Sequence, residues 1–398
     1  ALRGQFRWGD DRNITNSPNM EDGAGLWRIW TAPRSSQQYY PLTHTTFWLD
    51  TRIWGLSPAP FHATNVVLHA LGAVLLWRVL RRLGVPGAWL ASAVFALHPL
   101  QVESVAWITE RKNLLSGVFY FGSALLYLRW AGVGEDARGG ERRRGWQYGA
   151  ALALFACGML AKTAIVTLPA ALLVVLWWKR GGLTRADLRA LVPFLAIGFG
   201  LAAVTAKLEW GHVGAGGPEW SLSPAGRLVL AGRVLWFYAG KVLAPFGLVF
   251  IYPRWTIDAG DPRAWLFALS AAAVSAGLWL ARRRIGRGPV AGALFFGLTL
   301  SPVLGFLDFY FQLYSYVQDH FQYLAALGLL VPIVSGMASA FRKAVARFPV
   351  LRAPPAPVLL SALLLAPLGI LSAARIPALH DVETLWTTVF RDNPGAWM

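Results

Sequence analysis

The chain is poor in charge and almost devoid of cysteine. Only 14% of its 398 residues are Asp, Glu, Lys or Arg, whereas 56% are hydrophobic. Because a soluble domain usually carries about 25% charged residues, this composition excludes an ordinary soluble protein and predicts an integral membrane protein. The single cysteine, Cys157, excludes an intrachain disulfide and says little about the redox compartment.

Several motifs of nucleotide- and metal-dependent enzymes are also missing. There is no P-loop, no G-x-G-x-x-G turn, no cysteine-based zinc pattern and no G-x-S-x-G elbow, so nucleotide-driven chemistry is not expected. No signal peptide is visible: the chain opens on Ala1, its first hydrophobic span begins near His62, and a helix-like stretch runs to Met398. We expect the sequence to be a fragment of a longer protein.

Long apolar runs are what the chain has in abundance. A bilayer core needs about 20 apolar residues per helix, so we predict an all-α integral membrane bundle of about ten transmembrane helices. Three spans are short, namely the one that ends at His98 and the two on either side of Lys162. The candidate spans are residues 61–80, 88–98, 114–130, 148–161, 165–178, 191–208, 264–281, 290–306, 323–341 and 358–374.

The net charge of +17 is unevenly distributed. Basic residues in short loops mark the cytoplasmic side, and five stretches hold 20 of the 37 Lys and Arg but only four of the 20 Asp and Glu. The charge is therefore a topology signal, and no nucleic-acid partner is expected. The stretches are residues 78–82, 129–144, 179–189, 282–287 and 342–352.

This orientation requires the apolar segment 228–250 to stay on one side of the membrane. We therefore predict a re-entrant or interfacial helix at about 224–250, on the outer side. The resulting organisation is an outer loop at residues 1–59, a membrane bundle at 60–374 and an outer tail at 375–398.

Asp10 and Asp11 form an acidic pair in the outer segment FRWGDDRNITNSP. Carboxylates at a water–lipid boundary are costly to keep unless they bind a cation, take a proton or hold a polar substrate. An adjacent pair can hold a divalent cation such as Mg or Mn, or act as a base beside an orienting partner. The alternative is a solvated turn, because Asp-Asp with Asn-Ser-Pro nearby is ordinary turn chemistry.

A second outer segment, HPLQVESVAWITERK, combines acids and bases at helical spacing. It predicts a short surface helix with Trp107 toward lipid and its charges toward a cavity. Glu103 is a candidate third carboxylate, and Arg111 and Lys112 are candidates to neutralise a phosphate. The alternative is a routine interfacial helix with snorkelling basic residues.

Polar residues in or beside the spans are further candidates. His62, Asn65 and His69 share one stripe of a span, where hydrogen bonds to neighbouring helices are the favoured interpretation. Lys162 would cost about 2.5–3.5 kcal/mol at the bilayer centre, so we place it at the outer end of a helix pair, as a lipid-phosphate ligand or a plain anchor. The remaining candidates for substrate contact are His98, Arg254, Asp319 and His320.

Six stretches resemble, in order, the membrane half of the transmembrane and TPR-repeat-containing O-mannosyltransferases. They are DDRNITNSP, YYPLTHTTFWLDTRIWGLSPAPFHATNVVLH, HPLQVESVAWITERKNLLSG, AKTAIVTLP, KVLAPFGLVFIYPRW and SYVQDHFQYL. The bacterial multi-spanning TPR relatives look closer still, so a bacterial inner membrane is the expected location. The resemblance runs from Phe6 to Trp397, and LWTTVFRDNPGAWM resembles the approach to a first TPR repeat.

The resemblance implies a GT-C glycosyltransferase fold and activity. Such proteins move a sugar from a polyprenyl-phosphate carrier to an acceptor on the outer or luminal face. It further implies that Asp10 or Asp11 is the catalytic acid of the first outer loop and that Glu103 is the acid of the second. One position differs from the family pattern. Thr163 follows Lys162 where eukaryotic members often carry an acid, so the donor and acceptor of the eukaryotic members are not assigned to this chain.

The expected mechanism is a single displacement in which Asp10 deprotonates an acceptor hydroxyl. Basic side chains, Arg111, Lys162 and Arg254, would stabilise the departing lipid phosphate, while Asp11 and Glu103 would orient the acceptor or hold a divalent cation. A protein or peptide acceptor would be recruited by TPR repeats. The rival interpretations are an O-antigen-type glycan ligase, a lipid or solute transporter, and a membrane scaffold without catalysis.

Overall fold

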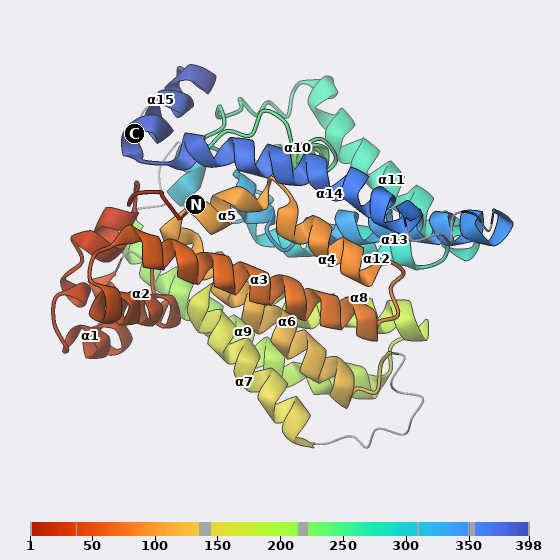
Figure 1. The fold of residues 1–398 in the computed structure, drawn as a ribbon, viewed down its shortest axis with the longest axis horizontal. Helices are drawn as coiled ribbons and strands as arrows, with labels where there is room; N and C mark the ends of the chain where they lie inside the picture. Colours follow the sequence, from red (N-terminus) through yellow and green to blue (C-terminus); the bar gives the residue numbers. More distant parts are fainter. Residues whose placement is uncertain are drawn as a thin grey trace.

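The computed structural model describes residues 2–36, 38–134, 145–213, 222–308, 310–348, 350 and 355–396. Within these ranges the chain forms α-helices joined by short 3-10 and π-type turns, and it forms no strand. Together with the apolar composition, this confirms the predicted class of an all-α membrane protein. Figure 1 shows most helices running side by side, with the first outer segment and helix α15 gathered at one end.

The α-helices are α1 (Gly25–Thr31), α2 (Pro41–Trp54), α3 (Pro58–Arg82), α4 (Ala88–Leu97), α5 (Gln101–Ala106), α6 (Arg111–Trp130), α7 (Gly145–Ala161), α8 (Leu168–Arg180), α9 (Arg185–Val213), α10 (Pro224–Leu243), α11 (Trp265–Ile285), α12 (Gly288–Leu300), α13 (Leu327–Arg347), α14 (Pro355–Arg375) and α15 (Val382–Asp392).

Six helical segments of the described chain are long and apolar enough to cross a membrane, and three shorter helices are apolar. The predicted count of about ten is not confirmed. Helix α4 shows why a span can fall short: His98 precedes Pro99 and takes an extended backbone, so the helix stops at Leu97. The six segments are Pro58–Arg82, Thr163–Arg180, Arg185–Leu208, Pro262–Ile285, Leu327–Arg347 and Ala356–Leu379.

The apolar side chains divide between a core and an outward surface. Phe95, Phe155 and Leu176 are fully buried among the helices. Helices α11 and α14, in contrast, bury none of the apolar window that qualifies them as spans, and their Leu280 and Leu363 are more than 70% exposed. Because a bilayer is itself an apolar solvent, these bare surfaces are suited to contact lipid.

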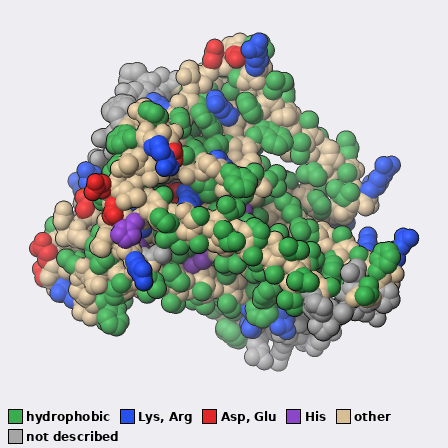
Figure 2. Space-filling model, turned by 45° about the horizontal axis from the view of Figure 1, so that its top comes forward, with side chains coloured by type: hydrophobic (Ala, Val, Ile, Leu, Met, Phe, Trp, Pro, Cys, Tyr) green, Lys and Arg blue, Asp and Glu red, His purple; other side chains and the backbone are tan. Residues whose placement is uncertain are grey.

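The predicted basic loops meet at one end of the bundle. Lys179 Nζ donates to the carbonyl of Leu83 over 2.7 Å, and Arg180 donates to the carbonyl of Ala131 over 2.5 Å. The ends of α3, α6 and α8 therefore lie together; we call this the basic end. In Figure 2 the charged side chains visible at the right edge are Lys and Arg, while the visible acidic ones lie mainly at the left and top. The rest of the predicted basic stretch, residues 135–144, lies outside the described residues.

The opposite end of the bundle, where α6 and α8 begin, collects segments that the sequence predicts to lie on the outer side. Lys162, between α7 and α8, donates to Asn113 Oδ1 over 2.6 Å, and the amide of Thr109 donates to Asp10 Oδ1 over 2.9 Å. We call this the polar end. Helix α10 reaches it too, because the carbonyl of Val242 lies 3.1 Å from His98 Nε2. The interfacial placement of residues 224–250 stays a prediction.

Candidate active site

The two members of the acidic pair point into different environments. Gly9 has a φ of +81°, which lets the chain turn sharply before Asp10. Asp10 is fully buried, and it accepts hydrogen bonds from the amides of Arg7 (2.8 Å) and Thr109 (2.9 Å) and from the Thr109 hydroxyl. Asp11 is exposed, and its Oδ1 accepts a hydrogen bond from the amide of Gly9 over 3.1 Å.

The buried position of Asp10 changes its proton affinity. Burial raises the pKa of this carboxyl to about 6, although its hydrogen bonds to Thr109 and Arg7 act in the opposite direction. The guanidinium of Arg7 is also buried, and none of its nitrogens forms a hydrogen bond to the described residues. A buried cation beside a carboxyl with a pKa near neutrality is typical of a functional site.

Glu103 connects three segments that are far apart in the sequence. Its carboxylate lies 2.5 Å from His320 Nδ1 and 3.1 Å from the Arg375 guanidinium. Arg375 also binds Asp319 over 2.6 Å, and the Tyr252 hydroxyl donates to Asp319 over 2.9 Å. Burial raises the pKa of Glu103, against the opposing effects of His320 and Arg375. Helix α5, the loop before α13 and the end of α14 therefore meet at this carboxylate.

Glu110 is the centre of a second ionic group. Its carboxylate lies 2.9 Å from Lys112 Nζ and 3.6 Å from Lys162 Nζ, and the Asn113 amide donates to it over 2.6 Å. Burial by itself would raise the pKa of Glu110, but the charges of His320, Lys112 and Lys162 outweigh burial and lower it well below its usual range. Glu110 is therefore ionised at neutral pH.

His320 joins the two ionic groups. Its Nε2 lies 3.7 Å from Glu110, while its Nδ1 contacts Glu103. Buried charges are retained in proteins when they are paired and hydrogen-bonded, as here. We call this set the buried charged cluster; its members are Glu103, Glu110, Lys112, Lys162, Asp319, His320 and Arg375.

Arg111 lies apart from that cluster and is fully buried. Its guanidinium pairs with Asp50 over 2.7 Å, donates to Asn65 Oδ1 over 2.9 Å and to the carbonyl of Phe61 over 3.0 Å, and lies over the ring of Phe47. These contacts join α2, α3 and α6. Because protein groups occupy most of its donors, Arg111 is better placed to support the site than to bind a phosphate.

The other predicted residues are dispersed. His62 is buried within α3, and His98 contacts the carbonyl of Val242 at the end of α10. Arg254 is exposed and donates to the Tyr316 hydroxyl over 3.4 Å. No contact joins Asp11 to Glu103, and no group of three or more His, Cys, Asp or Glu side chains suited to a metal occurs in the described part of the chain.

Three members of the site were not singled out from the sequence. Glu110 lies in the segment HPLQVESVAWITERK but is not among its predicted site residues, although it is the carboxylate that both lysines contact. Asn113 joins Glu110 to Lys162, and Arg375 closes the cluster from the last apolar helix. The sequence offers one signal for Arg375, a single arginine at the end of an apolar run. The same pattern is typical of a simple membrane anchor, so it does not indicate a site residue.

Comparison with characterised proteins identifies the relatives of the chain. It is 32% identical over 144 residues to the protein O-mannosyl-transferase TMTC1 of Homo sapiens, covering 32% of this chain and 16% of that protein. It is a relative of the TMTC proteins. TMTC3 of Homo sapiens is 34% identical over 109 residues, which are 26% of this chain and 12% of that relative.

The longest of these three matches is to a fly TMTC protein. The protein O-mannosyl-transferase Tmtc2 of Drosophila melanogaster is 31% identical over 217 residues, 51% of this chain and 23% of that protein. The matched region therefore spans less than a quarter of each of these three TMTC relatives. No protein-family model and no solved structure matches the chain.

Proposed function

We propose that the chain is the membrane part of a glycosyltransferase that moves a sugar from a polyprenyl-phosphate donor to a hydroxyl of a protein acceptor. The TMTC relatives are named as protein O-mannosyl-transferases, which supports mannose as the sugar. The structural observation that carries the proposal is the buried charged cluster beside the acidic pair, at one end of an apolar helical bundle. A site that joins an acid–base group to cations at a membrane surface suits a lipid-linked anionic donor.

The proposed reaction is a single displacement at the anomeric carbon. The acceptor oxygen forms a bond to this carbon while the bond from the carbon to the phosphate oxygen breaks, and the phosphate leaves with the electron pair. The acceptor proton passes to a carboxylate of the acidic pair. We assign direct contact with the acceptor to Asp11, since it is exposed and its Oδ2 accepts no hydrogen bond from the described residues. Asp10 positions the loop through its bonds to Thr109.

Lys112 and Lys162 are the proposed contacts for the lipid phosphate. Both ammonium groups lie within 4 Å of Glu110, and their side chains keep 15% and 13% of their surface exposed. Two cations that converge from separate elements can stabilise the charge that develops on a leaving phosphate. Glu110 holds them in place, so a donor phosphate meets a preorganised pair.

The polar end is the proposed extracytoplasmic side. The basic loops gather at the other end, and such loops are retained in the cytoplasm. At the polar end, α15 lies close to the loop that carries Asp10 and Asp11, with the ring centres of Trp8 and Trp386 6.3 Å apart. An acceptor delivered by a following TPR array would therefore arrive next to Asp11. The bacterial inner membrane stays a prediction.

The test is sugar transfer in lipid nanodiscs from a polyprenyl-phosphate-mannose donor to a peptide that contains Ser and Thr. Asp11→Asn should lower the transfer rate about 10²–10⁴-fold, as expected for loss of a general base, with unchanged donor affinity and thermal stability. Glu21→Gln, an exposed acid of the same loop, is the matched control and should leave the rate unchanged.

The variant Asp10→Asn distinguishes the role of Asp10 from that of Asp11. We expect it to lower both stability and rate, because the amide cannot accept the same three hydrogen bonds. If Asp10→Asn abolished transfer at full stability while Asp11→Asn had no effect, the base would be Asp10. Transfer at the normal rate in both variants would refute the proposed function.

A further inference from the structure

A hollow at the basic end lies outside the proposed active site. Its volume is about 650 Å³, and it lies between the C-terminal ends of α8 and α11. Helix α8 begins at the polar end and ends here, so its length, about 20 Å for 13 residues, separates the two places. The lining residues are Trp177, Trp178, Gly181, Trp279, Arg282, Arg283, Gly286 and Arg287.

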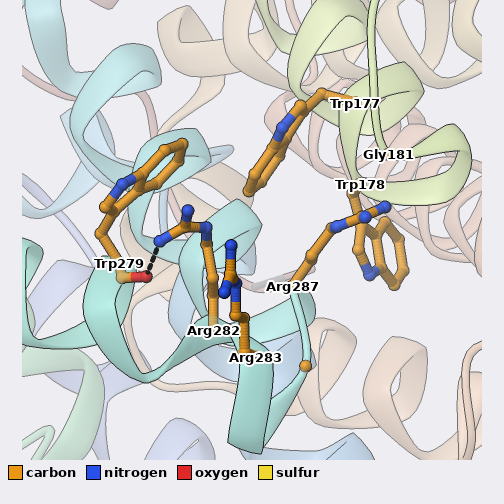
Figure 3. Close-up of a pocket in the computed structure, with 8 residues that line it drawn as sticks. Trp177, Trp178, Gly181, Trp279, Arg282, Arg283 and Arg287 are labelled. Atoms are coloured by element: carbon orange, nitrogen blue, oxygen red, sulfur yellow. Dashed lines mark hydrogen bonds between the residues drawn. The ribbon is translucent and has the colours of Figure 1, made fainter.

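Three guanidinium groups reach this hollow. Arg282 and Arg283 project from the end of α11 toward Trp177, and Arg287 approaches from the other side, beside Trp178 (Figure 3). Arg282 is held in place, because it donates to the carbonyl of Trp279 over 2.5 Å and lies 4.2 Å from the centre of that ring. No carboxylate of the described residues forms an ion pair with any of the three. Within the described part of the chain, the positive charge of the hollow is therefore uncompensated.

A stacked pair of tryptophans and a glycine shape the walls around these cations. Trp177 of α8 and Trp279 of α11 stack with their ring centres 5.5 Å apart and their planes 13° from parallel. Gly181 has a φ of +84°, and a Cβ at this position would lie 2.2 Å from Arg287 Nη1. Only glycine therefore leaves room for the Arg287 guanidinium where it lies.

Snorkelling is the ordinary explanation for arginines at helix ends. Snorkelling side chains extend separately into the headgroup water, whereas these three converge on one hollow from two neighbouring segments. Arginine is also the side chain that binds phosphate oxygens through two parallel hydrogen bonds. Beside the hollow, α11 exposes apolar surface at Leu280, which is 77% exposed and can contact acyl chains.

We propose that this hollow binds the phosphate of an anionic phospholipid headgroup, with Arg283 and Arg287 as its principal ligands. Trp177 and Trp279 form the wall at the level where indoles favour the membrane interface. Basic pockets between membrane helices are suited to such headgroups. The site is independent of the proposed transferase chemistry.

The test uses the intact protein in detergent with short-chain lipids, dioctanoyl phosphatidylglycerol as the anionic probe and dioctanoyl phosphatidylcholine as the zwitterionic one. Binding is read from tryptophan fluorescence and from bound lipid in native mass spectrometry. The double variant R283Q/R287Q should bind phosphatidylglycerol roughly 30-fold more weakly, at about fivefold for each arginine near the surface. The matched control is R342Q/K343Q on α13, which removes the same charge from exposed residues outside the hollow.

We expect the wild type and R342Q/K343Q to bind phosphatidylglycerol more tightly than phosphatidylcholine. This difference should be lost in R283Q/R287Q. Equal loss in R342Q/K343Q would show a general charge effect and overturn the site. Equal binding of the two lipids, or binding of inorganic phosphate alone without lipid, would overturn the assignment to an anionic lipid. Thermal unfolding of both variants checks that each one folds.

Discussion

The carboxylate of Glu103 and the imidazole of His320 lie 2.5 Å apart although 217 positions separate them in the sequence. His320 also faces Glu110 with its other ring nitrogen, 3.7 Å away. One imidazole therefore bridges two buried carboxylates of the same segment, between α4 and α6. Arg375 contacts Glu103 from the end of α14, so this helix is tied to the segment that leads to Lys112, one of the two proposed phosphate contacts.

Removal of the Glu103 carboxylate should destabilise the fold. Glu103→Ala removes the carboxylate partner of His320 Nδ1 and one of the two carboxylates that pair with Arg375, and the loss of one member of a buried charged group costs about 3–5 kcal/mol. The measurement is thermal unfolding in detergent followed by size-exclusion chromatography. Glu103→Gln, which keeps the shape and some hydrogen bonds, should lose less. An Ala variant as stable as the wild type would contradict the bridging role.

Lys162 should contribute to donor affinity more than to stability. Lys162→Ala is expected to raise the dissociation constant of a polyprenyl-phosphate-mannose donor about tenfold, the lower range for a partly hydrated hydrogen bond to a charged group. Isothermal titration or a filter-binding assay with a radiolabelled donor measures the effect. Lys343→Ala, at an exposed position on α13, is the control and should bind normally. Equal affinity in the two variants would remove Lys162 from the phosphate site.

Asp10 should produce a distinctive pH dependence of stability. Its pKa is about 6 in the folded state but about 3.9 in an unfolded chain, so between these values the folded state holds more protons. The contribution of Asp10 therefore falls as the pH rises from 4 to 6 and is constant above that. Other carboxyls titrate in the same range, so the quantity to measure is the difference between wild type and Asp10→Asn. A difference that did not vary between pH 4 and 6 would contradict the raised pKa.

The Thr109 hydroxyl should influence the pKa of the Asp10 carboxyl. It donates to the Asp10 carboxylate and lowers its pKa, so Thr109→Val should raise the pKa above 6 and destabilise the fold by about 1.5–3 kcal/mol. The pH-dependent difference described for Asp10 should move to higher pH in this variant. Thr109→Ser, which retains the hydroxyl, should behave like the wild type. The same shift in both variants would argue against the hydrogen bond as its cause.

Substitution of Arg111 should lower the stability of the fold without weakening donor binding. Lysine cannot reproduce its simultaneous contacts with Asp50, Asn65 and the carbonyl of Phe61, so Arg111→Lys should lower the unfolding temperature. The donor dissociation constant should stay within about twofold of the wild type. A selective loss of donor affinity at normal stability would instead place Arg111 at the phosphate, as the sequence predicted.

Several features of the site were predictable from local sequence. The cost of a cation among apolar runs points to Lys162, and the helical spacing of charges points to Glu103. Asp319 and His320 are candidates because they lie among aromatic residues in SYVQDHFQYL. All four belong to the buried charged cluster. The acidic pair was selected as a unit, yet adjacent residues in a turn can point in opposite directions. Only the turn at Gly9 and the contact with Thr109 distinguish buried Asp10 from exposed Asp11.

The sequence by itself determined the membrane class and the helical architecture, because transfer free energies and helix length depend on local runs of residues. Tertiary structure alone decided which charges are partners. Glu110 became the centre of a lysine pair, and Arg375 joined the cluster although 272 positions separate it from Glu103. The physical reason is that a charge buried from water depends on the groups within a few ångströms, and those groups come from segments that only the folded chain brings together.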